Sequence, residues 1–226
     1  MFQALDGTGA SGSGDPLGYW ADQSGNARHH VATQITGPDT RPTNDAGAAR
    51  FPDGTPWLNI PTGFHLLESS TLMMRIKADE DPPLSGEDLH CRLHALGAVS
   101  GGASAFYPKI DGHIWDGFGS STLYDIGDPT SDLTNWNVVS VSSDPTTGYI
   151  YKLNNVVLFT KTIAGGHVVD FGDPGVRTFG GALPNVNNSW FGRASDILIT
   201  EGAMNDSQDA AWYDYMTGAA DDPPIA

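Results

Sequence analysis

The sequence predicts an all-β protein in which two antiparallel sheets form a sandwich and one short helix lies near the C-terminus. Turn-forming residues, including 28 glycines and 15 prolines, are spread through the 226 residues and divide the chain into short segments. A sustained helical pattern occurs only in residues 204–218. Sandwiches of this size are often undivided, so we expect one domain.

The first structured segment is expected in GYWADQSGNARHH (18–30), which contains a tight turn. Asp22 and Ser24 can accept hydrogen bonds from backbone N–H groups two residues further on, and Asn26 tolerates positive φ. Trp20 precedes the turn and is expected in the core. The alternative is a calcium ion bound by Asp22 or Asn26, but oxygen-rich loops are more often turns than ion sites.

Alternation of apolar and polar residues predicts two half-buried strands, over 70–78 and 89–97. In the first strand, the residues expected to face the core are Leu72, Met74 and Ile76. Those expected on its outer face are Thr71, Arg75 and Lys77. In the second strand, the expected core residues are Leu89, Cys91, Leu93 and Ala95. Its expected outer residues are His90, Arg92 and His94.

His90, Cys91 and His94 are not expected to bind zinc in such a strand. The thiol lies on the opposite face from both imidazoles, and the two imidazoles, four residues apart, are separated by about 13 Å. Cys91 is the only cysteine, so it forms no internal disulfide and is expected to be a small core residue.

Further strands are predicted over 105–119, 135–144, 147–163 and 190–202. Two hairpin turns are expected, at Asp111-Gly112 and at Asn154-Asn155. Asparagine visits the left-handed region more readily than most residues, so the second pair suits a type I′ turn. The period-2 side chains expected to pack against the second sheet are Tyr149, Tyr151 and Leu153.

The helix predicted over 204–218 has signals at both ends. Asn205 is a favourable N-cap with Gln208 three residues later, and Gly218 can end the helix. An apolar stripe, which we expect to pack on the sandwich, consists of Ala211, Trp212, Tyr215 and Met216.

The chain carries a formal charge of −16, from 27 acidic and 11 basic residues. Such a surface repels nucleic acid and anionic membrane, so we expect neither as a partner. No segment has the pattern of a secretory signal, and none is long and apolar enough to span a membrane. We therefore expect synthesis and folding in the cytoplasm.

Three blocks of the sequence resemble the laminin-G-like branch of the concanavalin A-like lectin/glucanase superfamily. The first, YWADQSGNARHHVATQ, is similar to its W-x-D-x-S-G-N-x-x-H opening motif, and RFPDG (50–54) follows. The second, NWNVVSVSSDPTTGYIYKLNNVVL, is similar to its Y-x-N-G hairpin, with Asn155 where glycine is usual. The third, FGGALPNVNNSWFGRASDILITEGAMNDSQDAAWYDYM, is similar to its last strands and short terminal helix.

The resemblance implies a concanavalin A-like jelly-roll sandwich over 18–218, between a flexible Gly/Ser-rich segment (1–17) and an extended tail (219–226). It also implies that sugars or calcium bind in loops at one edge of the sandwich. Two oxygen-rich loops fit this expectation, 127–135 and 183–189. The candidate calcium ligands in them are Asp128, Asp132, Asn187 and Asn188.

Catalysis is not expected. Glucanases of this superfamily carry carboxylates on one strand, in the form E-x-D-x-E, and retaining hydrolysis needs two of them about 5 Å apart. The nearest acidic run, ADEDPPLSGED (78–88), is interrupted by Pro82-Pro83 and is expected in a loop. The sequence has no G-x-S-x-G elbow, Walker loop or zincin helix either. We therefore assign no catalytic residues.

Two non-enzymatic functions remain. In the first, the protein is a component of a viral surface, such as a bacteriophage head-decoration, fibre or tail accessory protein. Its partners would be other virion proteins or further copies of itself, and host glycans. The alternative is a free glycan-binding module; a glycoside hydrolase ranks last. For glycan binding, the candidates for exposed tryptophans that stack on sugar rings are Trp57, Trp115 and Trp190. The alternative is that they are core residues, as tryptophans in a sandwich more often are.

Overall fold

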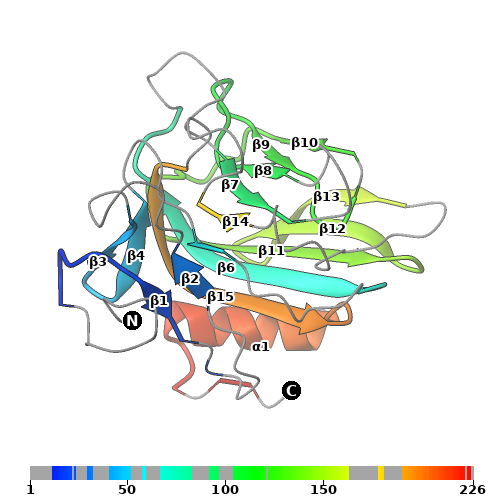
Figure 1. Cartoon of the computed structure of the whole chain (residues 1–226). Coiled ribbons are helices and arrows are strands. Elements are labelled where there is room, and N and C mark those ends of the chain that lie inside the picture. Colours follow the sequence, from blue (N-terminus) through cyan, green and yellow to red (C-terminus); the bar gives the residue numbers. More distant parts are fainter. Residues whose placement is uncertain are drawn as a thin grey trace.

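The computed structural model describes residues 12–21, 23, 30–32, 41–51, 58–59, 67–82, 92–96, 104–120, 122–162, 178–180, 190–221 and 223–224. Two antiparallel sheets pack face to face, and a single α-helix covers part of the outer face of one of them (Figure 1). The expected all-β sandwich with one short helix is confirmed.

The first sheet has eight strands in the order β1-β2-β5-β14-β7-β8-β9-β10. Along the chain they are β1 (Tyr19–Trp20), β2 (His30–Ala32), β5 (Leu58–Asn59), β7 (Arg92–Ala95), β8 (Ser104–Phe106), β9 (Ile114–Asp116), β10 (Tyr124–Gly127) and β14 (Thr178–Phe179). We call it sheet A.

Sheet B has seven strands in the order β13-β12-β11-β6-β15-β4-β3. They are β3 (Thr43–Asp45), β4 (Ala48–Phe51), β6 (Ser70–Ala78), β11 (Asn137–Asp144), β12 (Gly148–Leu153), β13 (Val156–Lys161) and β15 (Gly192–Glu201). The central strand β6 has the bounds predicted from the sequence, and it pairs with β11 on one side and β15 on the other.

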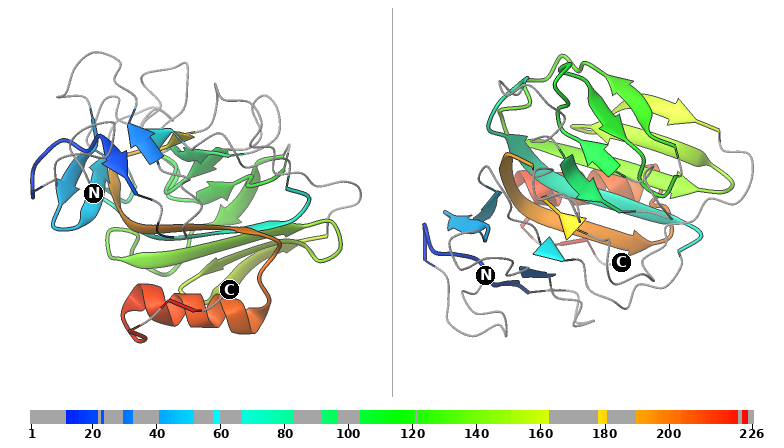
Figure 2. Two further views of the ribbon diagram at one scale, coloured as in Figure 1. Left: turned by 60° about the horizontal axis from the view of Figure 1, so that its bottom comes forward. Right: turned by 45° about the horizontal axis from the view of Figure 1, so that its top comes forward.

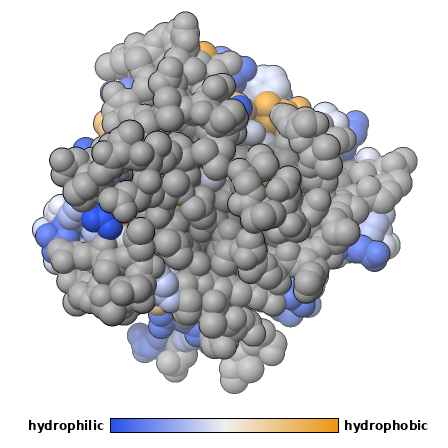
Figure 3. All heavy atoms as spheres, in the orientation of Figure 1, coloured by the Kyte–Doolittle hydropathy of each residue, from blue (hydrophilic) through white to orange (hydrophobic). Residues whose placement is uncertain are grey.

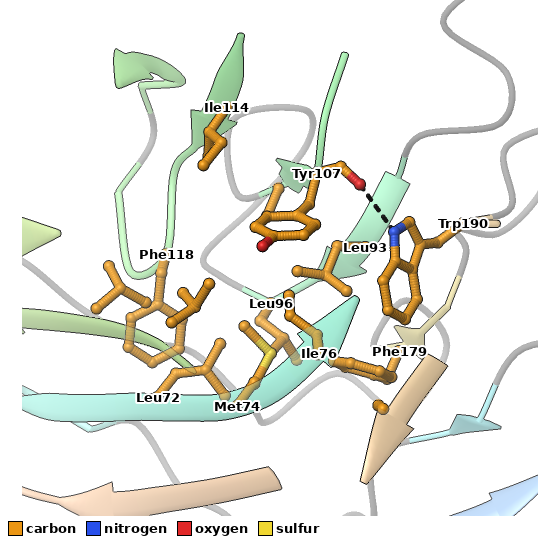
Figure 4. Close-up of a cluster of buried hydrophobic side chains, with 14 of the residues drawn as sticks. Leu72, Met74, Ile76, Leu93, Leu96, Tyr107, Ile114, Phe118, Phe179 and Trp190 are labelled. Carbon is orange, nitrogen blue, oxygen red and sulfur yellow. Dashed lines mark hydrogen bonds between the residues drawn. The ribbon is translucent and has the colours of Figure 1, made fainter. Parts of the chain in front are cut away.

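The core lies between the sheets, as Figure 4 shows. Leu72, Met74 and Ile76 point into it from β6, as their alternation predicts, and all three are fully buried. Trp190 packs against Phe179 in the same layer. The expected burial of Tyr149, Tyr151 and Leu153 is also confirmed.

The predicted hairpin between β12 and β13 turns at Asn154 and Asn155, whose φ angles are 51° and 61°. Two successive positive φ values are the requirement of a type I′ turn, which asparagine meets at lower cost than most residues. The Asn154 side chain also accepts a hydrogen bond from the backbone N–H of Val138, at 3.0 Å, so the turn is attached to β11.

The outward orientation expected for His94 is wrong, since its side chain is fully buried. The pairing of β7 with β8 shifts register between Arg92 and His94, and such a bulge breaks the simple alternation of faces. Nε2 of His94 lies 3.3 Å from a carboxylate oxygen of Asp116 without hydrogen-bond geometry. His90 and Cys91 lie outside the described residues.

Helix α1 (Asp206–Thr217) lies against the outer face of sheet B (Figure 2). The predicted cap is confirmed, because Asn205 and Gln208 form a reciprocal capping box and Gly218 ends the helix with φ 77°. Met216 of the helix packs with Met73 and Val138 of the sheet. The contact between the helix and sheet B is therefore apolar around Met216.

Lys152 of β12 attaches the start of the helix to sheet B. Its Nζ donates hydrogen bonds to Asp206 at 2.9 Å and to Asp209 at 2.8 Å. Ser140 of β11 donates to the other carboxylate oxygen of Asp209. Asp209 is 3% exposed, so these neighbours stabilise its charge in place of water.

The described surface is mainly polar. In the face shown in Figure 3, the described residues are mostly hydrophilic, with small hydrophobic areas. The large apolar side chains that are exposed include Val156, Val157 and Leu158, all on the edge strand β13. Within the described part of the chain, no helix is long and apolar enough to cross a membrane.

Candidate functional site

The three tryptophans predicted to bind sugar differ in where they lie in the structure. Trp190 has no exposed surface, and its indole Nε1 donates a hydrogen bond to the backbone carbonyl of Tyr107 at 2.9 Å. The expectation that Trp190 is exposed is therefore wrong, because the ring fills the space between the sheets and cannot contact a ligand. Trp57 lies outside the described residues.

Trp115 lies on the outer side of sheet A, because its neighbours in β9, Ile114 and Asp116, point inward. The side chain is half-buried, its Nε1 donates to Asp111 at 3.2 Å, and the ammonium of Lys109 lies 4.9 Å from the ring centroid. These neighbours leave Trp115 as a partly covered aromatic surface. Its role in sugar binding stays a prediction.

The candidate calcium loop is described over 127–135. Asp132 already accepts three hydrogen bonds there, from the backbone and hydroxyl of Thr134 and from the Asn135 amide. The first two hold the pKa of Asp132 below its usual value. Asp128 is exposed.

No group of three or more His, Cys, Asp or Glu side chains that could hold a metal occurs in the described residues. Asn187 and Asn188 lie outside the described residues. Calcium binding stays a prediction.

An open cavity of about 540 Å³ lies on the outer face of sheet B. Its walls come from the β3–β4 hairpin, from the second half of β6, from the start of β15 and from the residue that precedes β11. The residues that line this outer-face pocket are Asp45, Ala46, Gly47, Ala48, Arg75, Lys77, Trp136, Arg193, Ser195 and Asp196.

Trp136 is held in the outer-face pocket by two cations of β6. Asn137 pairs with Ile76, so Trp136 lies next to the outward residues of that strand. The guanidinium carbon of Arg75 is 4.8 Å from the Trp136 ring centroid, and the ammonium of Lys77 is 5.4 Å from it. Both distances lie within the range of cation–π attraction, so the ring and the two cations orient one another.

Arg193 joins two elements at the base of the pocket. Its guanidinium forms ion pairs with Asp45 of β3 and with Asp79, just after β6. The hydrogen bond from Arg193 holds the pKa of Asp45 below its usual value. Ser195 accepts a hydrogen bond from Arg75 at 3.3 Å and donates one to Asp196 at 2.6 Å. The pocket thus offers charged donors and acceptors around one aromatic ring.

The sequence indicated only part of this site. Alternation placed Arg75 and Lys77 on the outer face of a strand, and the structure confirms it. Trp136 and Arg193 come from strands more than fifty residues away in sequence, so their approach depends on sheet pairing. The Asn-Trp-Asn run at 135–137, at the start of a predicted strand, was the one signal for Trp136.

No protein-family model matches the chain, and no curated protein matches it. Solved structures do match it. The sialidase of Trypanosoma rangeli aligns with a TM-score of 0.61 at 11% identity, over 94% of this chain and 32% of that one. The chain therefore spans about a third of the sialidase.

Two smaller proteins match over most of their own length. Domain 4 of a GH43 extracellular arabinanase from Geobacillus stearothermophilus, solved with arabinotriose, has a TM-score of 0.54 at 18% identity, over 87% of this chain and 97% of that one. A heptameric SAP-like pentraxin from Limulus polyphemus has a TM-score of 0.52 at 18% identity, over 73% and 80%. At these identities the likeness shows a lectin-like β-sandwich fold and nothing finer.

Proposed function

We propose that the protein is a non-enzymatic carbohydrate-binding protein and that the outer-face pocket is its binding site. The observation that carries the proposal is the half-buried Trp136 in a cavity of about 540 Å³ whose lining also includes six charged or hydroxyl-bearing residues. Sugar sites combine an aromatic surface with several hydrogen-bonding groups that are already in position. Arg75, Ser195 and Asp196 supply such groups here.

Binding without catalysis is supported by the state of the carboxylates in the pocket. A general acid for glycoside cleavage needs a raised pKa, whereas Arg193 lowers the pKa of Asp45. Asp45 therefore has no proton to donate to a leaving group. Asp196 accepts a hydrogen bond from the Ser195 hydroxyl. The arabinanase domain, which carries a sandwich of this kind and was solved with arabinotriose, is consistent with a binding role.

A glycan array screened with the purified chain tests this proposal, with one run in calcium and one in chelator. We expect reproducible binding to one sugar class, and weaker binding by Trp136→Leu but not by Trp115→Leu. Silence of the folded protein in both runs would refute carbohydrate binding. Binding that only Trp115→Leu abolishes would place the site on sheet A, and loss in chelator would support the predicted calcium loop.

We also propose that the chain acts on the surface of a virus particle, where it contacts other virion proteins or copies of itself. The exposed apolar side chains of Val156, Val157 and Leu158 on β13 support a protein contact at that edge, because exposed edge strands readily pair with other chains. An antibody against the chain should label intact particles from the organism that encodes it. Labelling confined to host material would contradict this placement.

A further inference from the structure

The outer-face pocket concentrates positive charge on an acidic protein. The chain has 11 basic residues and a formal charge of −16. Three of the 11, Arg75, Lys77 and Arg193, line this one pocket. Arg50, which is not part of the lining, shares the carboxylate of Asp79 with Arg193. The local charge is therefore opposite to that of the molecule as a whole.

Two of these cations have fewer carboxylate partners than Arg193 among the residues that the structure describes. Arg193 has two carboxylate partners, Asp45 and Asp79. Arg75, in contrast, donates to the neutral hydroxyl of Ser195, and neither Arg75 nor Lys77 forms an ion pair with a carboxylate among the residues that the structure describes. Both side chains are half-buried, so their attraction for an anion is less screened than that of a fully exposed lysine.

Trp136 keeps the two cations in place by cation–π attraction. A guanidinium that stacks on a ring uses its flat face, whereas its N–H groups lie at its edge and stay available to an acceptor. The same ring attracts the Lys77 ammonium from 5.4 Å. Donors held in this way lose little conformational freedom when a ligand binds, which favours recognition of an anion.

We propose that the outer-face pocket selects glycans that carry a carboxylate or sulfate group, which Arg75 and Lys77 bind as a pair. This inference rests on the proposed function and assigns its ligand class. Asp196 and Ser195 lie beside the cations and are able to bond the sugar hydroxyls. Trp136 has two roles, because its ring is the aromatic surface of the site and also positions Arg75 and Lys77. The cations outside the pocket are scattered on an acidic surface, which disfavours a long nucleic acid strand.

Pairs of probes that differ only in charge test the inference by calorimetry. Suitable pairs are an oligogalacturonide and its methyl ester, a sulfated glycosaminoglycan fragment and its desulfated form, and a sialylated oligosaccharide and its asialo form. We expect one charged probe to bind and its neutral counterpart to bind at least tenfold more weakly. Arg75→Gln and Lys77→Gln should each lower the affinity for the charged probe about 10- to 100-fold, which is the effect of losing a hydrogen bond to a charged group.

Lys161→Gln is the matched control, because it makes the same charge change on β13, three strands from β6 in sheet B. It should leave affinity unchanged. The acidic remainder of the molecule repels an anionic probe equally in the wild type and in Arg75→Gln, so this repulsion cancels in the ratio of their affinities. The ratio then reports the attraction of Arg75 for the probe, and it should fall as salt rises, because salt screens that attraction. Trp136→Leu should weaken binding as much as the cation variants do, and Trp136→Phe should restore most of it. Thermal denaturation of each variant verifies folding.

The outcomes separate this inference from the proposed function. Equal binding of the charged and neutral members of every pair, with no effect of Arg75→Gln, overturns the charge selection and leaves carbohydrate binding intact. Failure of every charged and neutral sugar to bind the folded chain refutes both. Binding of duplex DNA that competes with the charged probe at equal concentration would reassign the pocket to nucleic acid.

Discussion

A surface pair affects the ionisation of one histidine, His113. Nδ1 of His113 lies 2.9 Å from a carboxylate oxygen of Asp125, across the β9–β10 hairpin. The hydrogen bond to this carboxylate raises the pKa of His113 above its usual value. A raised folded-state pKa means that the stabilisation is fully present below the pKa of the unfolded chain and is lost as pH rises through the folded pKa.

We expect NMR titration to find the pKa of His113 above that of an unstructured histidine. Asp125→Asn should return it towards the ordinary value, because the amide carries no charge. The amide still has an oxygen to accept the hydrogen bond that Asp125 now accepts from the backbone of Gly127. The change is therefore specific to charge. A His113 pKa that is the same in both proteins would show that the ion pair does not form in solution.

At the scale of elements, α1 is attached to sheet B by one buried cation. Burial lowers the pKa of Lys152, but the hydrogen bonds to Asp209 and Asp206 outweigh it and raise the pKa. Lys152→Met leaves the Asp209 carboxylate, whose side chain is 5% exposed, without its cation. Removal of one member of a buried pair typically costs about 3–5 kcal/mol, so we expect a loss near the lower value in the free energy of unfolding.

Asp206→Asn is the control for this prediction, and urea denaturation measures both variants. The Asp206 side chain is 98% exposed, so its ion pair with Lys152 is screened, and its loss should cost less than about 1 kcal/mol. Equal destabilisation by both variants would mean that the buried and exposed carboxylates contribute alike. A preserved free energy of unfolding in Lys152→Met would mean that the helix is held by its apolar contacts alone.

The elements with a regular local pattern were predicted well from the sequence. Strand 70–78, the Asn154-Asn155 turn and the capped helix each depend on neighbouring residues, so a short window contains the information. The orientation of His94 was not predictable in this way, because a bulge is defined by the partner strand. The Trp136 pocket was missed for the same reason, since three separate strands and a hairpin build it. Trp190 illustrates the remaining ambiguity, because a tryptophan suits both a core and a sugar site.

At the scale of the whole molecule, a buried polar cluster connects the two sheets. The hydroxyl of Tyr149, in sheet B, donates a hydrogen bond at 2.6 Å to Asp116, in sheet A. Asp116 also accepts a hydrogen bond from the backbone N–H of Phe118 at 2.7 Å, and it lies beside the buried His94. Burial and the adjacent Asp116 raise the pKa of Tyr149, so the phenol keeps its proton and remains a donor. The cluster therefore fixes how one sheet sits on the other.

We expect Tyr149→Phe to lower the free energy of unfolding by about 1–3 kcal/mol, because it leaves a buried carboxylate with one donor fewer. Chemical denaturation provides the measurement. Tyr151→Phe is the matched control, since it removes a hydroxyl from the same buried face of β12 without removing the donor to Asp116. A larger loss in the control than in Tyr149→Phe would contradict the importance of this hydrogen bond for stability.

The position of β6 also has a consequence for synthesis on the ribosome. This strand ends at Ala78, yet one of its partners, β15, extends to Glu201. At translation rates of about 5–20 residues per second, on the order of ten seconds pass between the synthesis of β6 and the synthesis of β15. During this interval an apolar strand has an open edge, which is a risk for aggregation. Sheet B can therefore be completed only after residue 201 has been synthesised, and the expression yield of the chain should be sensitive to growth temperature and to chaperones.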